Sequence, residues 1–231
     1  MEDKSNPIKR PELYWFIAAL IVGSMLATSL LAVRYFYWSS LGHLYLAWNL
    51  FLAWVPVGFA FLAWRYKEDK IRLYLFAALW LLFLPNAPYL VTDLIHLRAR
   101  PPVPVWFDMV LLQSFIGLGL LLGFVSLYKM QLLTAHFYGK RASWIFVLVV
   151  VALTGFGIYL GRVQRFNSWD AIINPIGLFT ELFGHLATHT KAVSLFSLLY
   201  GVFFLGAYVV LYGLTHLRFE VRELRNPKNE S

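Results

Sequence analysis

Polar side chains recur at helical spacing within the segment PNAPYLVTDLIHLRAR, residues 85–100. Successive members are three, four, three and four positions apart, which places them on one face of a helix: Asn86, Tyr89, Asp93, His96 and Arg100. Asp93 and His96 lie one turn apart, so they could act as a general acid and base or as a pair of metal ligands. The alternative is an interfacial helix end whose polar residues reach water and lipid headgroups.

Two arginines close a later apolar run that ends near residue 161. Arg162 and Arg165 are three positions apart, and two guanidinium groups on one helical face suit an anionic group such as a phosphate or a carboxylate. Anchoring at the edge of a membrane explains the same pair equally well. Polar residues that favour helix starts follow at 167, 168 and 170, so at least one of them is expected to cap a new helix.

Asp108 lies near the start of an apolar run that should already be entering lipid. An ionised carboxylate facing hydrocarbon would cost roughly 2.5–3.5 kcal/mol or more. We therefore expect Asp108 to face the interior of a helix bundle, with Arg162, Arg165, Arg98 or His43 as its partner. A structural pair and a functional site are both compatible with this position.

A third set of polar residues has the spacing of possible metal ligands, four and four, in Glu181, His185 and His189. On a helix these side chains follow one side and drift towards its edge. The sequence contains no HExxH-type signature around them. The solvated face of an amphipathic helix in the membrane plane, about residues 171–188, accounts for the same pattern.

The chain that carries these residues is too apolar for a soluble fold. Of its 231 residues 60% are hydrophobic and 14% are charged, against roughly 25% charged in an ordinary soluble domain. This composition excludes a soluble enzyme, a disordered chain and a collagen-like rod. The net charge of +8 does not predict nucleic-acid binding, because the basic residues lie between apolar runs. The absence of cysteine excludes disulfides, a thiolate nucleophile and a cysteine-ligated metal site.

We therefore expect an all-α, polytopic transmembrane bundle that forms a single domain. The apolar runs predict about six spans, at residues 13–33, 41–64, 71–97, 105–128, 143–161 and 193–217, with tails at 1–12 and 218–231. Pro85 and Pro88 predict a break in the third span, which could cross the bilayer or re-enter it. Discontinuous helices of this kind often build binding sites.

The distribution of lysine and arginine orients these spans. The two tails and the connections after the second and fourth spans hold 14 of the 20 basic residues, and the other three connections hold 6. Under the positive-inside rule both tails are then cytoplasmic. The proline break, the segment after residue 161 and four of the six histidines, at 43, 96, 185 and 189, would share the outer face.

Three separated motifs carry a resemblance to a known family: WNLFLAWVP at 48–56, FLPNAPYLVTDLIHL at 83–97 and GIYLGRVQRFNSWD at 157–170. Together they resemble the family of small bacterial multi-pass membrane proteins named as domain of unknown function 1361 (DUF1361). The resemblance implies a multi-pass protein of the bacterial cytoplasmic membrane. It implies no activity, so the functional argument comes from the residues.

The concentration of polar residues on one side predicts an outward-facing site. Three residues are candidates for acid–base chemistry: Asp93, His96 and Asp108. Six are candidates for binding a substrate: Asn86, Tyr89, Arg98, Arg162, Arg165 and Asp170. The site could belong to an envelope enzyme that acts on a lipid-linked or anionic headgroup substrate, to a small-anion transporter or binding protein, or to a non-catalytic accessory subunit. The lack of ionisable residues in the inner half weakens the transporter hypothesis. The lipid bilayer is the expected partner, and the sequence predicts neither a cofactor nor an oligomeric state.

Overall fold

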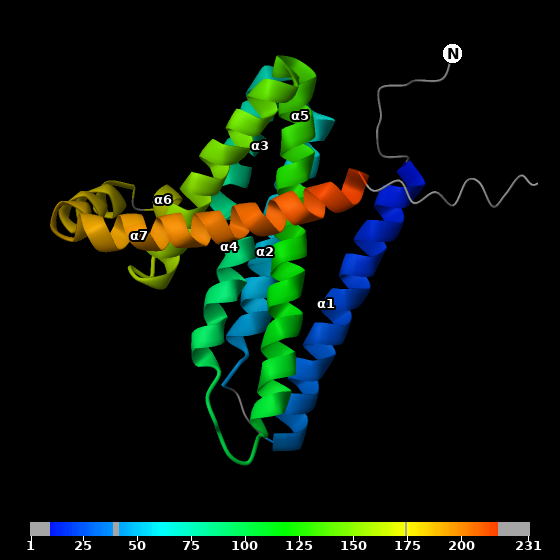
Figure 1. Cartoon of the computed structure of the whole chain (residues 1–231), viewed down its shortest axis with the longest axis vertical. Coiled ribbons are helices and arrows are strands. Elements are labelled where there is room, and N and C mark those ends of the chain that lie inside the picture. The colour runs from blue at the N-terminus through cyan, green and yellow to red at the C-terminus, as the bar shows by residue number, and fades with distance from the viewer. Residues whose placement is uncertain (1–9, 39–41, 174, 217–231) are drawn as a thin grey trace, which may run out of the picture.

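The computed structural model describes residues 10–38, 42–173 and 175–216, excluding the side chains of 10–13, 171, 172, 175, 178, 179, 181–189 and 216. Its helices are α1 (Arg10–Trp38), α2 (Tyr45–Arg65), α3 (Lys70–Phe83), α4 (Asn86–Tyr89), the 3-10 helix η1 (Leu90–His96), α5 (Val105–Arg162), α6 (Asp170–Ile173) and α7 (Pro175–His216). Figure 1 shows their arrangement. Within the described residues no strand forms, apart from one isolated bridge between Arg100 and Val103.

Five helical segments are long and apolar enough to cross a membrane, as expected for an all-α membrane protein. They are Tyr14–Trp38, Tyr45–Arg65, Lys70–His96, Val105–Arg162 and Thr190–Thr215. Because a span of the hydrocarbon core needs about 20 residues, the 58-residue α5 is far too long to be a single crossing.

The α5 helix reverses its direction at Gly139, and in Figure 1 its green chain turns back on itself at the top of the view. Gly139 has φ 84° and ψ 169°, a left-handed conformation that strains residues with a side chain. We call residues 105–138 the first arm and residues 140–162 the second arm. Both arms are longer than the expected spans at 105–128 and 143–161, because no proline interrupts the sequence between these spans and the helix continues to the glycine.

The core of the bundle lies where α2 and α7 pack against α5. One face of α2 is fully buried, through residues spaced four, three, four and three apart: Leu46, Leu50, Ala53, Val57 and Ala60. The α1 helix lies at the edge and packs mainly on α5. Most of its surface is exposed in the protein alone and is apolar enough to face lipid.

The last helix contains both the expected interfacial segment and the expected last span in one element. The α7 helix runs from Pro175 to His216, because no proline follows Pro175 to end it, and in Figure 1 its golden first turns run in a different direction from its orange remainder. It packs along α5 and crosses the first arm at a steep angle in Figure 1.

The third apolar segment is broken where the two prolines occur. The α3 helix ends at Phe83 after 14 residues, and the chain continues as the single-turn α4 and then as η1. We call residues 84–96 the break segment. Pro85 and Pro88 have no amide hydrogen to donate to the preceding turn, so the α-helix cannot continue through them intact.

The break segment packs against both arms of α5 at glycines. A side chain at Gly119 on the first arm would place its Cβ 2.5 Å from the carbonyl oxygen of Ala87. A side chain at Gly157 on the second arm would place its Cβ 2.5 Å from Cγ of Pro85. Small residues let helix backbones approach this closely. Gly157 and Gly161 therefore pack against Pro85 and Tyr89 of the break segment.

Candidate functional site

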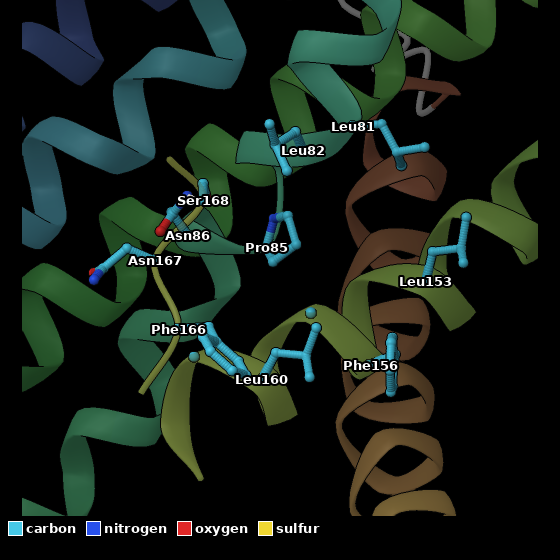
Figure 2. A pocket seen from close by; sticks show the side chains of 12 residues that line it. Leu81, Leu82, Pro85, Asn86, Leu153, Phe156, Leu160, Phe166, Asn167 and Ser168 are labelled. Carbon is cyan, nitrogen blue, oxygen red and sulfur yellow. Dashed lines mark hydrogen bonds between the residues drawn. The ribbon is translucent and has the colours of Figure 1, made fainter. Parts of the chain in front are cut away.

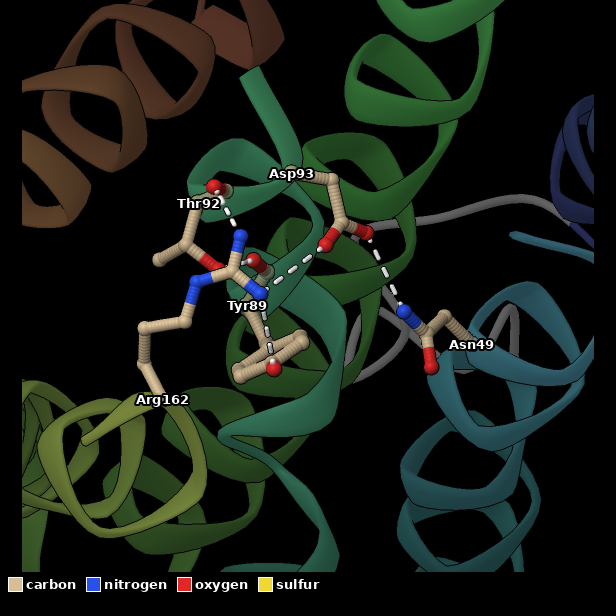
Figure 3. A network of polar contacts seen from close by, with 5 residues as sticks. All are labelled: Asn49, Tyr89, Thr92, Asp93 and Arg162. Carbon is tan, nitrogen blue, oxygen red and sulfur yellow. Dashed lines mark hydrogen bonds and ion pairs between the residues drawn. The ribbon is translucent and has the colours of Figure 1, made fainter. Parts of the chain in front are cut away.

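Asp93 is the buried carboxylate of the break segment, with 1% of its surface exposed. One carboxylate oxygen, Oδ2, accepts a hydrogen bond of 3.1 Å from the side-chain amide of Asn49 on α2. The other oxygen, Oδ1, lies 3.5 Å from Nη1 of Arg162 on the second arm of α5. No hydrogen bond within the described structure reaches Oδ1, so this ion pair is loose (Figure 3).

Arg162 uses its guanidinium group to hold the break segment at several points. Nη1 donates to the hydroxyl of Tyr89 at 3.2 Å, and Nη2 donates to the backbone carbonyl of Thr92. The same guanidinium carbon lies 5.4 Å from the centre of the Tyr89 ring, within the range of a cation–π contact. We call Asn49, Tyr89, Thr92, Asp93 and Arg162 the latch, because their contacts join α2, the break segment and α5 (Figure 3).

A cavity of about 170 Å³ lies between α3, the break segment and the second arm. Its wall is formed by Leu81, Leu82, Pro85, Asn86, Leu153, Phe156, Gly157, Leu160, Gly161, Phe166, Asn167 and Ser168. Figure 2 shows the polar residues of this wall together on one side, away from Leu81, Leu153 and Phe156. The cavity is therefore amphipathic, with a long apolar wall and a short polar one.

Asn86 fixes the polar side of this cavity. Its side-chain nitrogen donates two hydrogen bonds of 2.9 Å, one to the carbonyl oxygen of Phe83 and one to Oγ of Ser168. The first bond ties Asn86 to the last turn of α3, and the second reaches the chain that follows α5. Asn86 thus connects segments that are 82 positions apart in the sequence.

Asp108 is buried against a cation, as expected, but the cation is Arg34 and none of the four expected partners. Nε of Arg34 lies 2.6 Å from Oδ1 and Nη2 lies 3.1 Å from Oδ2, so the guanidinium binds both carboxylate oxygens. The side chains are 0% and 2% exposed. The sequence prediction misses Arg34 because it ends the first span at Val33, whereas α1 continues to Trp38 and carries Arg34 into the bundle.

Next to this pair lies a further titratable residue, His43. His43 is fully buried, and neither ring nitrogen makes a hydrogen bond with the described residues. Burial lowers the pKa of His43 to about 4, and the nearby charge of Arg34 adds to that shift. The ring stacks on Tyr45 at 5.9 Å, and the buried hydroxyl of Tyr45 is also without a partner in the described structure. A buried polar group that lacks a hydrogen bond costs about 1–3 kcal/mol.

Asp93 and His96 contact successive turns of α2. Asp93 bonds with Asn49, and the ring of His96 meets the ring of Tyr45 edge-on at 5.3 Å. Among the described residues no hydrogen bond or ion pair joins Asp93 to His96. The expected acid–base pair is therefore not formed in this conformation.

The other candidate residues lie apart from the latch. Arg98 and Arg165 are exposed, and Arg165 cannot share a helical face with Arg162 because α5 ends at Arg162. Asp170 accepts a hydrogen bond of 2.7 Å from the backbone of Asn167, which closes the turn before α6.

The side chains of Glu181, His185 and His189 lie outside the described residues. Among the residues that are described, no group of three histidine, cysteine or acidic residues could hold a metal ion.

Sequence reasoning missed Arg34 and Tyr45 as members of this polar region. A lone arginine directly after a long apolar run was the available signal for Arg34. Tyr45 gave no signal, because an aromatic residue near the end of a span is ordinary in a membrane protein.

A family comparison matches the part of the chain that contains the latch and the cavity. A family model described as "Protein of unknown function (DUF1361)" matches residues 48–206, which is more than half of the chain. No curated protein and no solved structure matches the chain. The three motifs at 48–56, 83–97 and 157–170 fall within the matched range, and the fold brings them together. Asn49 bonds with Asp93, Asp93 pairs with Arg162, and the rings of Trp48 and Trp169 meet at 6.1 Å.

Proposed function

The chain belongs to the DUF1361 family, whose function is unknown, and from that premise we propose that it is a membrane protein that binds a lipid-like molecule in the cavity beside the latch. The observation that carries this proposal is the lining of the cavity. A long apolar wall and a few uncharged polar groups at one side are what an amphipathic molecule requires.

The proposed membrane arrangement has six crossings. They are α1, α2, α3 with the break segment, the two arms of α5, and α7. The ratio of 14 to 6 basic residues favours a cytoplasmic location for both ends of the chain. In that orientation the break segment and the latch belong to the outer half of the bilayer.

The cavity supports binding better than acid–base catalysis. None of its 12 lining residues has a titratable side chain, and neither Asp93 nor His96 belongs to the lining. Anion transport has less support, because the guanidinium of Arg162 is already paired with Asp93 and bonded to Tyr89 and Thr92. In this proposal the latch is a positioning device that holds one wall of the cavity against α5.

Native mass spectrometry of the protein in a mild detergent tests the proposal. We expect one lipid-sized molecule to remain bound to the wild-type protein. The Leu160→Trp variant fills the cavity and should lose this molecule. The Val149→Trp variant adds the same side chain at an exposed position on the same arm and should retain it. Equal retention by both variants, or no retained molecule in the wild type, would contradict the proposal.

A further inference from the structure

The polar side of the cavity can form hydrogen bonds but carries no charge. Three of its 12 lining residues are polar, namely Asn86, Asn167 and Ser168, and all three are uncharged. Arg162 does not line the cavity, and its guanidinium is held by Asp93 in the latch. A ligand at this wall therefore meets amide and hydroxyl groups.

The orientation of the Asn86 amide is fixed by its own hydrogen bonds. Its side-chain nitrogen donates to the carbonyl oxygen of Phe83, which can only accept. If the amide were flipped, its own oxygen would face this carbonyl oxygen, and neither atom could donate a hydrogen bond. The amide oxygen, Oδ1, is consequently left as an acceptor. None of the described residues donates a hydrogen bond to it.

Ser168 supplies the complementary group. Its Oγ atom accepts a hydrogen bond of 2.9 Å from the amide nitrogen of Asn86. The hydroxyl proton of Ser168 therefore remains available as a donor, and no described acceptor takes it. An acceptor on Asn86 and a donor on Ser168 thus belong to two side chains that line the cavity and contact one another.

A hydroxyl group on the ligand satisfies both of these groups. Its proton can bond to Oδ1 of Asn86, and its oxygen can accept from the hydroxyl of Ser168. An ionised phosphate would place its oxygens against the Asn86 acceptor. It would also lose hydration without gaining a cation from the lining residues, which is costly.

We propose that the cavity receives the hydroxyl-bearing end of an uncharged, single-chain lipid and excludes a phosphate-bearing one. This inference rests on the proposed lipid binding and names the class of lipid. The volume of about 170 Å³ is smaller than the roughly 300–1,000 Å³ of pockets for drug-sized ligands, so the cavity suits the end of a single chain. A chain end fits such a space better than a bulky headgroup does.

Three probes with the same chain and different ends test the proposal: hexadecanol, hexadecyl methyl ether and hexadecyl phosphate. Their affinities for the purified wild-type protein can be measured by displacement of the retained lipid and by thermal shift. Hexadecanol should bind about 3- to 10-fold more tightly than the ether, which lacks the donor proton. Hexadecyl phosphate should bind at least about 10-fold more weakly than hexadecanol.

A variant assigns the polar contact to the cavity. Ser168→Ala removes the donor to the ligand oxygen, and an ether oxygen accepts from that donor as an alcohol oxygen does, so the variant should weaken hexadecanol and the ether by a similar factor of about 3- to 10-fold. Ser114→Ala is the matched control, because the Ser114 hydroxyl bonds within its own helix to the carbonyl of Val110, and it should change neither affinity.

The outcomes separate the two proposals. Equal affinities for the alcohol and the ether, or a phosphate that binds as tightly as the alcohol, would overturn the hydroxyl assignment while lipid binding stands. Failure of all three probes to bind would overturn the proposed function, and the hydroxyl assignment with it.

Discussion

Two arginine–aspartate pairs stabilise the same bundle in different ways. Arg34 and Asp108 form a closed pair, with both carboxylate oxygens bonded and both side chains almost fully buried. Arg162 and Asp93 form an open pair, with a separation of 3.5 Å, an oxygen that accepts no hydrogen bond in the described structure, and 18% of the arginine side chain exposed.

The difference indicates a division of roles. A closed, bidentate pair gives its elements one geometry, and its side chains are too deeply buried for a ligand to reach. It joins α1 to α5 and has a structural role: it holds the framework of the bundle together. The open pair shares its arginine with Tyr89 and Thr92 and lies beside the amphipathic cavity. It can loosen and reform at a lower cost, which suits the wall of a binding site.

The largest expected effect is at the closed pair. Asp108→Asn removes the charge that balances the buried Arg34, and it should destabilise the protein by about 3–5 kcal/mol. Thermal unfolding in detergent measures this loss. The double variant Arg34→Met with Asp108→Leu should recover most of it, because an apolar pair avoids the cost of burying charge. A change within experimental error for Asp108→Asn would mean that the pair is not framework.

The next-largest expected effect is a loss of stability at low pH, caused by His43 beside the closed pair. The pKa of His43 is about 4 in the folded protein and about 6.5 in an unfolded chain, so the unfolded state binds the proton first as the pH falls. Stability is therefore lost between about pH 6.5 and pH 4, and the loss should reach about 2 kcal/mol at pH 5 relative to pH 7.

A variant distinguishes the contribution of His43 to this pH dependence from the contributions of its charged neighbours. These neighbours are Arg34, Asp108, Arg100 and His96. His43→Phe keeps a ring against Tyr45 and removes both ring nitrogens, for which the described residues offer no hydrogen-bond partner. Its stability should not show the loss of about 2 kcal/mol between pH 7 and pH 5. Identical pH profiles for the variant and the wild type would show that His43 is not held neutral by its site.

The smallest expected effect is at the open pair. Asp93→Asn keeps an oxygen for Arg162 and a hydrogen-bonding group for Asn49, and water can reach part of Arg162. The loss of stability should be about 1 kcal/mol, well below that of the same substitution at Asp108. Thermal unfolding of the two variants under the same conditions gives the comparison directly. A larger loss for Asp93→Asn than for Asp108→Asn would reverse the assignment of the two pairs.

The sequence predicts the framework better than the site. Long apolar runs locate the helices, and the cost of a charge in lipid requires a buried partner for Asp108. The identity of that partner depends on how far α1 extends and how it packs on α5. Neither is encoded in local hydropathy, so Arg34 was missed.

The helical wheel describes the break segment only approximately. It assumed an α-helix through the break segment, where the chain forms the 3-10 helix η1. At three residues per turn, Asp93 and His96 lie above one another, and both contact α2. Tyr89 and Asp93 both reach Arg162 on α5. The contact of Asp93 with Arg162 joins positions 69 residues apart, and only tertiary packing brings them together.

One measurement tests most directly whether the cavity beside the open pair is a binding site. The chain has no native cysteine, so single cysteines can be labelled without background. Ser168→Cys places a thiol at the polar side of the cavity, and Ser126→Cys places one at a fully buried position on α5. In intact cells, a small impermeant thiol reagent should modify the Ser168→Cys variant at least about 10-fold faster, because a thiol in a packed core hardly ionises. Added hexadecanol should slow that reaction. Equal protection of both variants, or a rate at Ser168→Cys that hexadecanol does not change, would contradict the account.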